Sequence, residues 1–274
     1  MKKIYFIIIL LVTFVACNDV EKKVEIKTID KQIKEVLKVD SAWIRDSIAI
    51  AKEIALKKKL ITNDNVNEKL SLFGENNKET RIKIKTKYGS IKIKLYKDTP
   101  LHRANFLMLI RKGYFDSTLF YRVIENFMIQ GGNSDTDDIG TRMKNIGYYE
   151  IPNEIKSNHI HKRGALAMAV RDQRDTPERY RHRNSSAYNF YIIQKGPLSD
   201  KYMSKIEKKY NITIPKKNKA VYRTIGGSPH LDNLYTVFGE VYSGLSVIDK
   251  IASVLVDQNK RPKKDIYITT EILK

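Results

Sequence analysis

Two short runs of alternating apolar and charged residues constrain the fold more than any other feature of this chain. In residues 81–86 and again in 91–95, isoleucine, leucine or threonine occupies every second position. Successive side chains of a β-strand point to opposite faces, so this period of two predicts two strands that each bury one face. Residues 88–90, Tyr-Gly-Ser, supply a turn between them. The two runs therefore predict a β-hairpin.

The pattern after this hairpin is also dominated by strands. Strand-like segments recur at 118–130, 164–170, 188–194, 234–242 and 265–272. One helix is expected to begin after Thr99 as the N-cap, with Pro100 in its first turn and Gly113 just past its end. A second helix is expected at 246–253. Many strands with only two helices favour a closed β-barrel or a sandwich over an α/β sheet.

The N-terminus has the pattern of an export signal. Lys2 and Lys3 precede an uncharged, mostly apolar run from Ile4 to Val15, which is too short for a membrane-spanning helix of about 20 residues. Cys17, the only cysteine, follows this run directly after the small residue Ala16. The segment resembles the lipobox of bacterial lipoproteins, which implies cleavage before Cys17 and lipid attachment to its thiol. An ordinary signal peptide with a chance cysteine is the alternative.

The pattern predicts four regions along the chain. Residues 1–16 are expected to be a lipoprotein signal peptide and residues 17–28 a polar tether. Residues 29–79 are expected to form a helical arm over about 29–61, where apolar residues recur at three- and four-residue spacings, followed by a polar linker. Residues 80–274 then form the main domain, with charged surface insertions near 171–184 and 199–224, the second partly helical.

The chain is strongly basic, with a formal net charge of +20, and most of the excess lies in the main domain. Such a charge attracts anionic partners, and the basic insertions could make weak contact with an anionic surface such as an acidic membrane. A generally lysine-rich surface is the simpler interpretation. We expect no specific nucleic-acid partner, because the sequence contains no recognised nucleic-acid-binding motif.

The segment FYRVIENFMIQGG, residues 120–132, resembles the central signature of the cyclophilin family of peptidyl-prolyl cis-trans isomerases. Further segments agree in the family order: YGSIKIKLYKDTPLHRANF upstream, then HKRGALAMA, NFYIIQ, LDNLYTVFGEV and RPKKDI downstream. The resemblance covers roughly residues 81–274. It implies an eight-stranded antiparallel β-barrel closed by two helices, and an enzyme that rotates Xaa-Pro peptide bonds. In this chain the barrel would follow the N-terminal helical arm.

The reaction sets its own requirements. Rotation about a peptide bond has an energy barrier of about 18–20 kcal/mol because the nitrogen lone pair is delocalised into the carbonyl. No covalent bond breaks, so we expect no cofactor and no metal. A donor aimed at the proline nitrogen would stabilise the twisted state, and the resemblance gives Arg122 this role. Gln130, eight residues on, is an even offset along a regular strand and can share the face of Arg122.

The resemblance also assigns the remaining site residues. Tyr235 takes the place of a frequent histidine and is expected to act beside Arg122 and Gln130. The expected substrate-binding residues are Phe127, Met128, Ala169, Asn189, Tyr191 and Leu231. In the absence of the signature, the apolar members would be ordinary core residues of a barrel strand.

Several positions depart from the family pattern. Asn189 stands where glutamine is usual, and Val170 replaces a common asparagine. His230 stands where cyclosporin-sensitive members carry tryptophan, so we expect weak cyclosporin binding. These changes leave open an alternative function, a catalytically weak module that binds proline-containing or unfolded segments. The leading interpretation is an isomerase that assists exported proteins, anchored by lipid in the bacterial cell envelope, on the periplasmic face or the cell surface.

Two patterns that could suggest metal sites are incomplete. Asp135, Asp137 and Asp138 faintly suggest a calcium loop, but Ile139 and Ile146 stand where oxygen ligands are needed. His159 and His161 have no cysteine or carboxylate pattern beside them, so we interpret them as ordinary surface or hydrogen-bonding histidines.

Overall fold

The computed structural model describes residues 19–136, 138–170 and 183–274, and the chain divides into two compact units between Lys59 and Leu60. The first unit contains the helix α2 (Asp19–Lys59). The helix begins before the predicted arm and covers most of the predicted tether, because no glycine or proline interrupts residues 19–59. Within the described ranges, no helix is both long enough and apolar enough to cross a membrane. Cys17 and the predicted signal peptide lie outside them.

The second unit begins with a helix where we predicted a linker. Residues 66–76 form α3 (Val66–Asn76), which buries Val66, Leu70 and Gly74 and packs against α4 (Pro100–Arg111). A Cβ on Gly74 would lie 3.2 Å from the Cβ of Ala104, so the missing side chain permits the close approach of the two helices. The linker prediction was wrong. The helix buries only three positions of an otherwise polar segment, so no clear apolar periodicity indicated it in the sequence.

The sheet of the second unit is antiparallel and curls into a barrel. Its strands are β1 (Arg81–Thr86), β2 (Gly89–Leu95), β3 (Leu119–Ile124), β4 (Met128–Asn133), β5 (Glu150–Ile151), β6 (Ala165–Val170), β7 (Ser185–Ile193), β8 (Val237–Ser243) and β9 (Thr269–Leu273). Eight of them follow the order β3-β4-β7-β6-β8-β2-β1-β9, and β5 pairs with β7. Backbone hydrogen bonds join residues 117–120 to residues 266–268 and so connect the two edges. The predicted mainly β barrel is confirmed, with β5 as an addition.

Two helices pack against the barrel as predicted, α4 and α8 (Leu245–Ala252). The inward faces of the strands and the apolar face of α4 form one core. Phe106 on α4 lies at its centre, with ring centroids 4.7 Å from Phe115, 5.4 Å from Phe190 and 5.4 Å from Phe238. The buried Ile82, Ile84, Ile91, Ile93 and Leu95 confirm the alternation read from the hairpin.

The first turn of α4 is capped by a residue distant in sequence. The side chain of Thr99, which we predicted as the N-cap, makes no capping hydrogen bond. The Glu154 carboxylate instead accepts hydrogen bonds from the backbone N–H groups of Leu101, at 3.1 Å, and His102, at 2.9 Å. A negative charge at this end also complements the helix dipole. Gly113 follows the helix with φ +65°, as expected for a C-terminal glycine.

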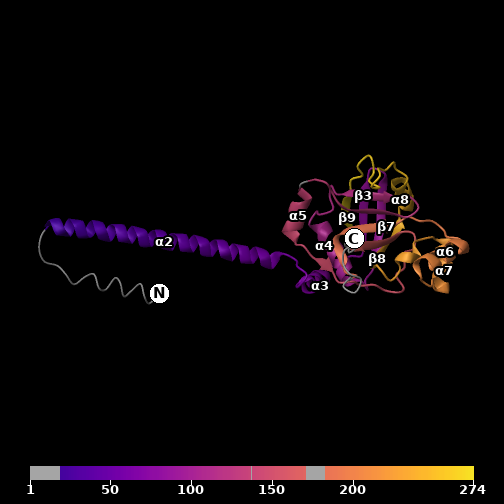
Figure 1. Ribbon diagram of the computed structural model, residues 1–274, viewed down its shortest axis with the longest axis horizontal. Coiled ribbons are helices and arrows are strands. Elements are labelled where there is room, and N and C mark those ends of the chain that lie inside the picture. Colours follow the sequence, from indigo (N-terminus) through magenta and orange to yellow (C-terminus); the bar gives the residue numbers. More distant parts are fainter. Residues whose placement is uncertain (1–18, 137, 171–182) are drawn as a thin grey trace. The chain divides into compact units, whose positions relative to one another are not determined.

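The segment 199–224 forms a helical hairpin, α6 (Asp200–Tyr210) and α7 (Lys216–Thr224), followed by the short helix η2 (Pro229–Leu231). Figure 1 shows α6 and α7 together at one side of the unit. Their buried residues Met203, Ile206 and Tyr222 form a small core with Leu198 and Ile214. Residues 199–224 are therefore partly helical, as predicted. Most of the first insertion, 171–184, lies outside the described residues.

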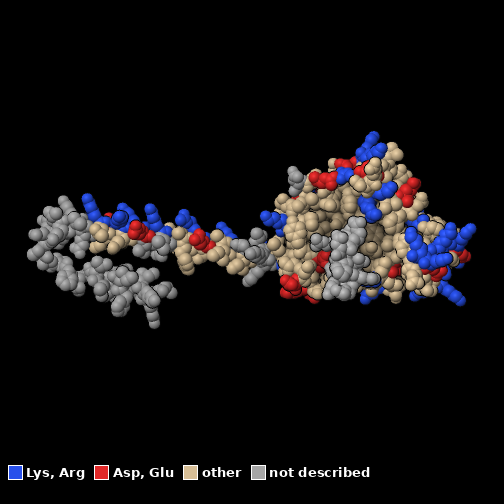
Figure 2. All heavy atoms as spheres, in the orientation of Figure 1, with Lys and Arg blue, Asp and Glu red and all other residues tan. Residues whose placement is uncertain are grey.

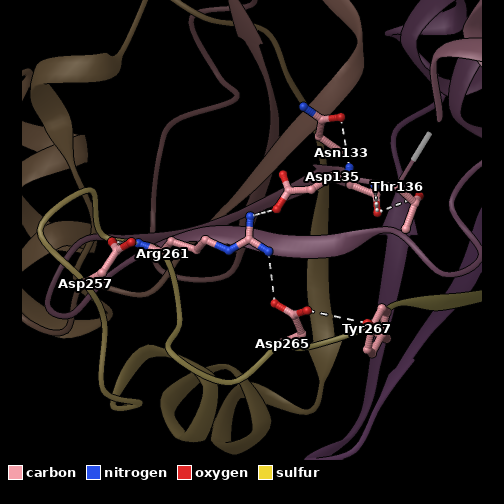
Figure 3. Close-up of polar contacts among 8 residues, drawn as sticks. Asn133, Asp135, Thr136, Asp257, Arg261, Asp265 and Tyr267 are labelled. Carbon is pink, nitrogen blue, oxygen red and sulfur yellow. Dashed lines mark hydrogen bonds and ion pairs between the residues drawn. The ribbon is translucent and has the colours of Figure 1, made fainter. Parts of the chain in front are cut away.

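The loop after β4 and the loop before β9 are joined by ion pairs of Arg261. Figure 3 shows its guanidinium group between Asp135 and Asp265, and the distance to Asp265 is 3.0 Å. The backbone N–H of Arg261 donates to Asp257, which closes the turn behind it. Asp138, at the start of α5 (Asp138–Ile146), pairs with Arg142 at 2.5 Å. Two carboxylates of the faint calcium pattern are thus engaged by arginines.

Candidate active site

Arg122 and Gln130 lie opposite each other on β3 and β4. The two residues are directly paired in the antiparallel register, and Nη1 of Arg122 donates to Oε1 of Gln130 at 3.1 Å. We predicted one continuous strand over 118–130, and this was wrong because the chain turns between Ile124 and Met128. Asn126 adopts φ +59° in this turn, a conformation that asparagine tolerates. The shared face of Arg122 and Gln130 therefore arises from cross-strand pairing.

An apolar pocket of about 160 Å³ lies beside this pair, on the outer face of the barrel. It is lined by Arg122, Phe127, Met128, Gln130, Ala169, Val170, Tyr191, Leu231 and Tyr235. Met128 and Tyr191 are buried at its base, whereas Arg122 is exposed at its rim. Its apolar and aromatic residues other than Val170 belong to a cluster separate from the barrel core. The structure thus brings together eight of the nine residues predicted for the site.

Asn189, the ninth residue, lines the neighbouring hollow. This second hollow, of about 700 Å³, shares Gln130, Ala169 and Val170 with the pocket. Nδ2 of Asn189 donates to Oγ of Ser186 at 3.3 Å. Its Oδ1 is buried and accepts no hydrogen bond from the described part of the chain. Asn189 therefore borders the candidate site without reaching the apolar pocket.

A buried chain of hydrogen bonds holds the base of the pocket. The Tyr191 hydroxyl lies 3.0 Å from Nε2 of His161, and Nδ1 of His161 lies 3.0 Å from Oδ1 of Asp232. Because a carboxylate oxygen accepts, Nδ1 carries the proton and Nε2 accepts from Tyr191 in the neutral ring. The Tyr222 hydroxyl donates to the other oxygen of Asp232 at 2.6 Å. The network links α7 to the base of the pocket.

Burial raises the pKa of Tyr191 well above its usual value, and nearby Tyr235 and Asp232 raise it further. Tyr191 is therefore a neutral hydrogen-bond donor at physiological pH. The Tyr235 ring packs edge-on against Tyr191, with centroids 5.9 Å apart. No sequence pattern indicated this support, since His161, Tyr191 and Asp232 are far apart along the chain and meet only in the folded domain.

The described residues contain no group of three or more histidine, cysteine or acidic side chains arranged to hold a metal ion. His159 pairs with Asp98 at 2.8 Å, while His161 belongs to the buried network. The pocket offers one guanidinium, one amide and an apolar wall. Such a site can bind an apolar ring beside a peptide group, and it contains neither a nucleophile with a base nor a metal ligand set.

The fold and the pocket define a cyclophilin-like protein, and comparison with known proteins identifies the family. The sequence profile described as "Cyclophilin type peptidyl-prolyl cis-trans isomerase/CLD" matches residues 81–271. The chain therefore belongs to the cyclophilin-type peptidyl-prolyl cis-trans isomerase family. The predicted resemblance is confirmed at this level.

Two curated relatives and one solved structure illustrate the similarity. A Streptococcus pyogenes protein, whose name combines a phosphatase with a peptidyl-prolyl cis-trans isomerase, is 34% identical over 201 residues, 72% of this chain and 39% of the relative. "Peptidyl-prolyl cis-trans isomerase-like 2" of Rhizopus delemar is 29% identical over 254 residues, 91% of this chain and 40% of the relative. The chain thus spans about two fifths of the length of these relatives. A Cryptosporidium parvum cyclophilin-type isomerase shares the fold, with a TM-score of 0.50, 22% identity and coverage of 72% and 98% of the two chains.

Proposed function

We propose that this protein is a peptidyl-prolyl cis-trans isomerase, and the arrangement of Arg122 beside the apolar pocket carries the proposal. Uncatalysed exchange of Xaa-Pro bonds takes tens to hundreds of seconds. Acceleration by about five decades requires about 7 kcal/mol of stabilisation that is specific to the twisted state. A protein can supply this by binding both isomers loosely and the twisted bond tightly.

The pocket residues divide this task between them. The proline ring would enter the apolar pocket against Phe127, Met128 and Leu231, where burial holds it still. In the twisted state the proline nitrogen regains its lone pair and accepts a hydrogen bond from the Arg122 guanidinium. Gln130, which accepts a hydrogen bond from Arg122 at 3.1 Å, orients this donor or holds the substrate carbonyl. The preceding residue would then rotate beside Ala169, with Tyr235 covering the ring from the opposite wall.

The test compares wild type with Arg122→Ala on a neutral Xaa-Pro peptide. The interaction forms only in the transition state, so kcat and kcat/KM should fall together, by about 100- to 1000-fold. Arg81→Ala removes another exposed arginine, from β1, and serves as the matched control. An Arg122→Ala enzyme that retains wild-type kcat/KM would refute the role assigned to this side chain.

The same assay distinguishes the isomerase from the alternative, a binding module with little turnover. Val170 lines the pocket where an asparagine is common in the family, and the Asn189 side chain does not reach the pocket. If the folded wild type accelerates no peptide, a titration with the same peptides should show binding. Reversion of Val170 to asparagine would then be the first change to restore turnover.

The proposed setting is the bacterial cell envelope, with the domain held at a membrane by lipid on Cys17 and acting on exported, proline-containing polypeptides. The sequence before and around Cys17 supports this, and isomerisation needs no ATP. Cys17→Ser should move the full-length protein from the membrane fraction to the soluble fraction and abolish labelling by a fatty acid. Unchanged fractionation would refute the anchor and leave the enzymatic proposal intact. Weak contact of the basic insertions with anionic membranes stays a prediction, which salt-dependent vesicle binding would test.

A further inference from the structure

The helical hairpin α6–α7 is fixed to the barrel beside the candidate site. Its small core is joined to the site by the hydrogen bond from Tyr222 to Asp232, and the backbone N–H of Leu198 donates to Tyr222 at 2.9 Å. α6 also packs against η2, the short helix that carries Leu231 into the pocket. Side chains at the end of α6 therefore have a defined position relative to the pocket.

Three stacked rings extend from the pocket to the last residue of α6. Phe127, at the pocket wall, stacks on His230 with centroids 5.7 Å apart and planes inclined by 27°. His230 in turn stacks on Tyr210, at 4.8 Å and 18°. Nδ1 of His230 has no hydrogen-bond partner within the described ranges, so stacking helps to hold this ring. The three rings form a row that extends from the pocket in one direction.

Burial lowers the pKa of His230, and nearby His161 lowers it further. Asp232 opposes this shift, while Lys209 and Lys195 add to it, and the pKa stays below its usual value. The ring is therefore neutral near pH 7, which suits stacking between two aromatic neighbours. The backbone N–H of Lys195 donates to the carbonyl of Phe127 at 3.3 Å, which places Lys195 next to the first ring, and Lys209 directly precedes Tyr210, the last ring. Two cations thus accompany the row of rings.

These two lysines belong to different elements and are oriented by aromatic rings. Nζ of Lys195, which follows β7, lies 4.6 Å from the Tyr202 ring centroid, and Nζ of Lys209 lies 5.1 Å from that of Tyr210. Lys209 also complements the dipole at the end of α6, a purely structural explanation that does not apply to Lys195. Figure 2 shows Lys and Arg side chains gathered over the region of α6 and α7.

The carboxylates of the hairpin are already engaged. Asp200 pairs with Arg223 at 2.7 Å, and Glu207 pairs with Lys219 at 2.9 Å. Neither Lys195 nor Lys209 has an ion-pair partner in the part of the chain that the structure describes. The surface beside the pocket therefore combines the edges of a row of aromatic rings with uncompensated positive charge.

We propose that Phe127, His230, Tyr210, Lys195 and Lys209 form an extension of the substrate groove that selects Xaa-Pro segments with an acidic residue near the proline. This inference rests on the proposed function. The centroid steps of 5.7 Å and 4.8 Å correspond to at most about three residues of extended chain. A glutamate two to four residues from the proline would therefore reach the lysines, and only on one side of it, because the rings leave the pocket in one direction.

The experiment measures kcat/KM of the full-length protein for a neutral Xaa-Pro peptide and for versions with glutamate or lysine two to four residues before or after the proline. Glutamate on one side should raise kcat/KM about threefold to tenfold over the neutral peptide, as expected for two partly exposed ion pairs. The lysine version should be slower than the neutral peptide, and both differences should shrink at high salt.

The ratio of glutamate to neutral peptide is then compared between two double variants. Lys195→Gln/Lys209→Gln should bring this ratio close to one. Lys216→Gln/Lys217→Gln removes the same charge from the first turn of α7, where Lys217 borders a separate hollow, and should retain the wild-type ratio. A wild-type ratio near one, or an equal loss in both variants, would overturn the inference while leaving the isomerase intact.

Failure of the proposed function has a different signature, because then no peptide is isomerised at all. Fluorescence anisotropy of the same labelled peptides would decide the inference in that case. Tighter binding of the glutamate peptide that is lost only in Lys195→Gln/Lys209→Gln supports the extension. Equal affinities for the glutamate, neutral and lysine peptides reject it.

Discussion

Tyr191→Phe isolates the contribution of the buried network beneath the pocket. The substitution keeps the ring that lines the pocket and removes only the hydroxyl that lies 3.0 Å from His161 Nε2. His161 is fully buried, so its Nε2 is left without a partner and without access to water. A buried polar group that loses its partner costs about 1–3 kcal/mol. We expect the variant to be about 2 kcal/mol less stable than wild type.

Urea unfolding of the full-length protein measures this change, which corresponds to a fall in Tm of about 4–8 °C for a domain of this size. Tyr267→Phe is the control, because Tyr267 is 53% exposed and its hydroxyl is 3.4 Å from Asp265. The control should stay within about 0.5 kcal/mol of wild type. Because the ring remains, kcat/KM for a neutral peptide should change by less than about twofold. A Tyr191→Phe variant as stable as the control would refute the view that the network supports the pocket.

Three further predictions concern stability and ligand binding. Glu154→Ala removes the acceptor for two N–H groups of α4 and for Nδ1 of buried His102, at 2.7 Å. The variant should lose about 2–3 kcal/mol of unfolding free energy in urea. Glu154→Gln should lose less, and equal losses in the two variants would contradict the capping role. Burial raises the pKa of Tyr188, Tyr191 and Tyr222, so these tyrosines stay protonated when unfolded ones ionise near pH 10. Stability should therefore be complete below pH 10 and fall above it, by up to about 1.4 kcal/mol per pH unit for each tyrosine; equal unfolding midpoints at pH 9 and pH 11 would contradict this. Cyclosporin should bind weakly, because His230 replaces the family's tryptophan and stacks between two rings; tight stoichiometric inhibition in a titration would be the contrary result.

The strands that bury one face were the most predictable part of the fold. Ile82 to Leu95 alternate because one face meets the core and the other meets water, so the sequence carries the period directly. The turn between Ile124 and Met128 was missed because it has no glycine or proline, and Asn126 alone supplies the left-handed residue. α3 was missed because its few buried positions lie within a polar segment.

The site was predicted where residues follow one another in a family signature, as Arg122, Phe127, Met128 and Gln130 do. The reasoning for Gln130 was nevertheless incomplete, since it faces Arg122 across a hairpin and not along one strand. The supporting network was not predictable, because hydrogen bonds between residues as distant as His161 and Asp232 leave no periodic pattern in the sequence. The same holds for the stacking of Tyr210 on His230, which depends on how an insertion folds back.

The pairing of β1 with β9 has a consequence for the order in which the domain can assemble. β1 is the first strand to be synthesised, yet its second neighbour is the last strand of the barrel. Until β9 is available for pairing, one edge of β1 offers unpaired N–H and C=O groups, a template for pairing with other chains. Contacts of such large sequence separation also slow folding. The barrel must therefore close late, and Lys83 and Lys85 place on β1 itself the charged side chains that disfavour edge-to-edge pairing with other chains.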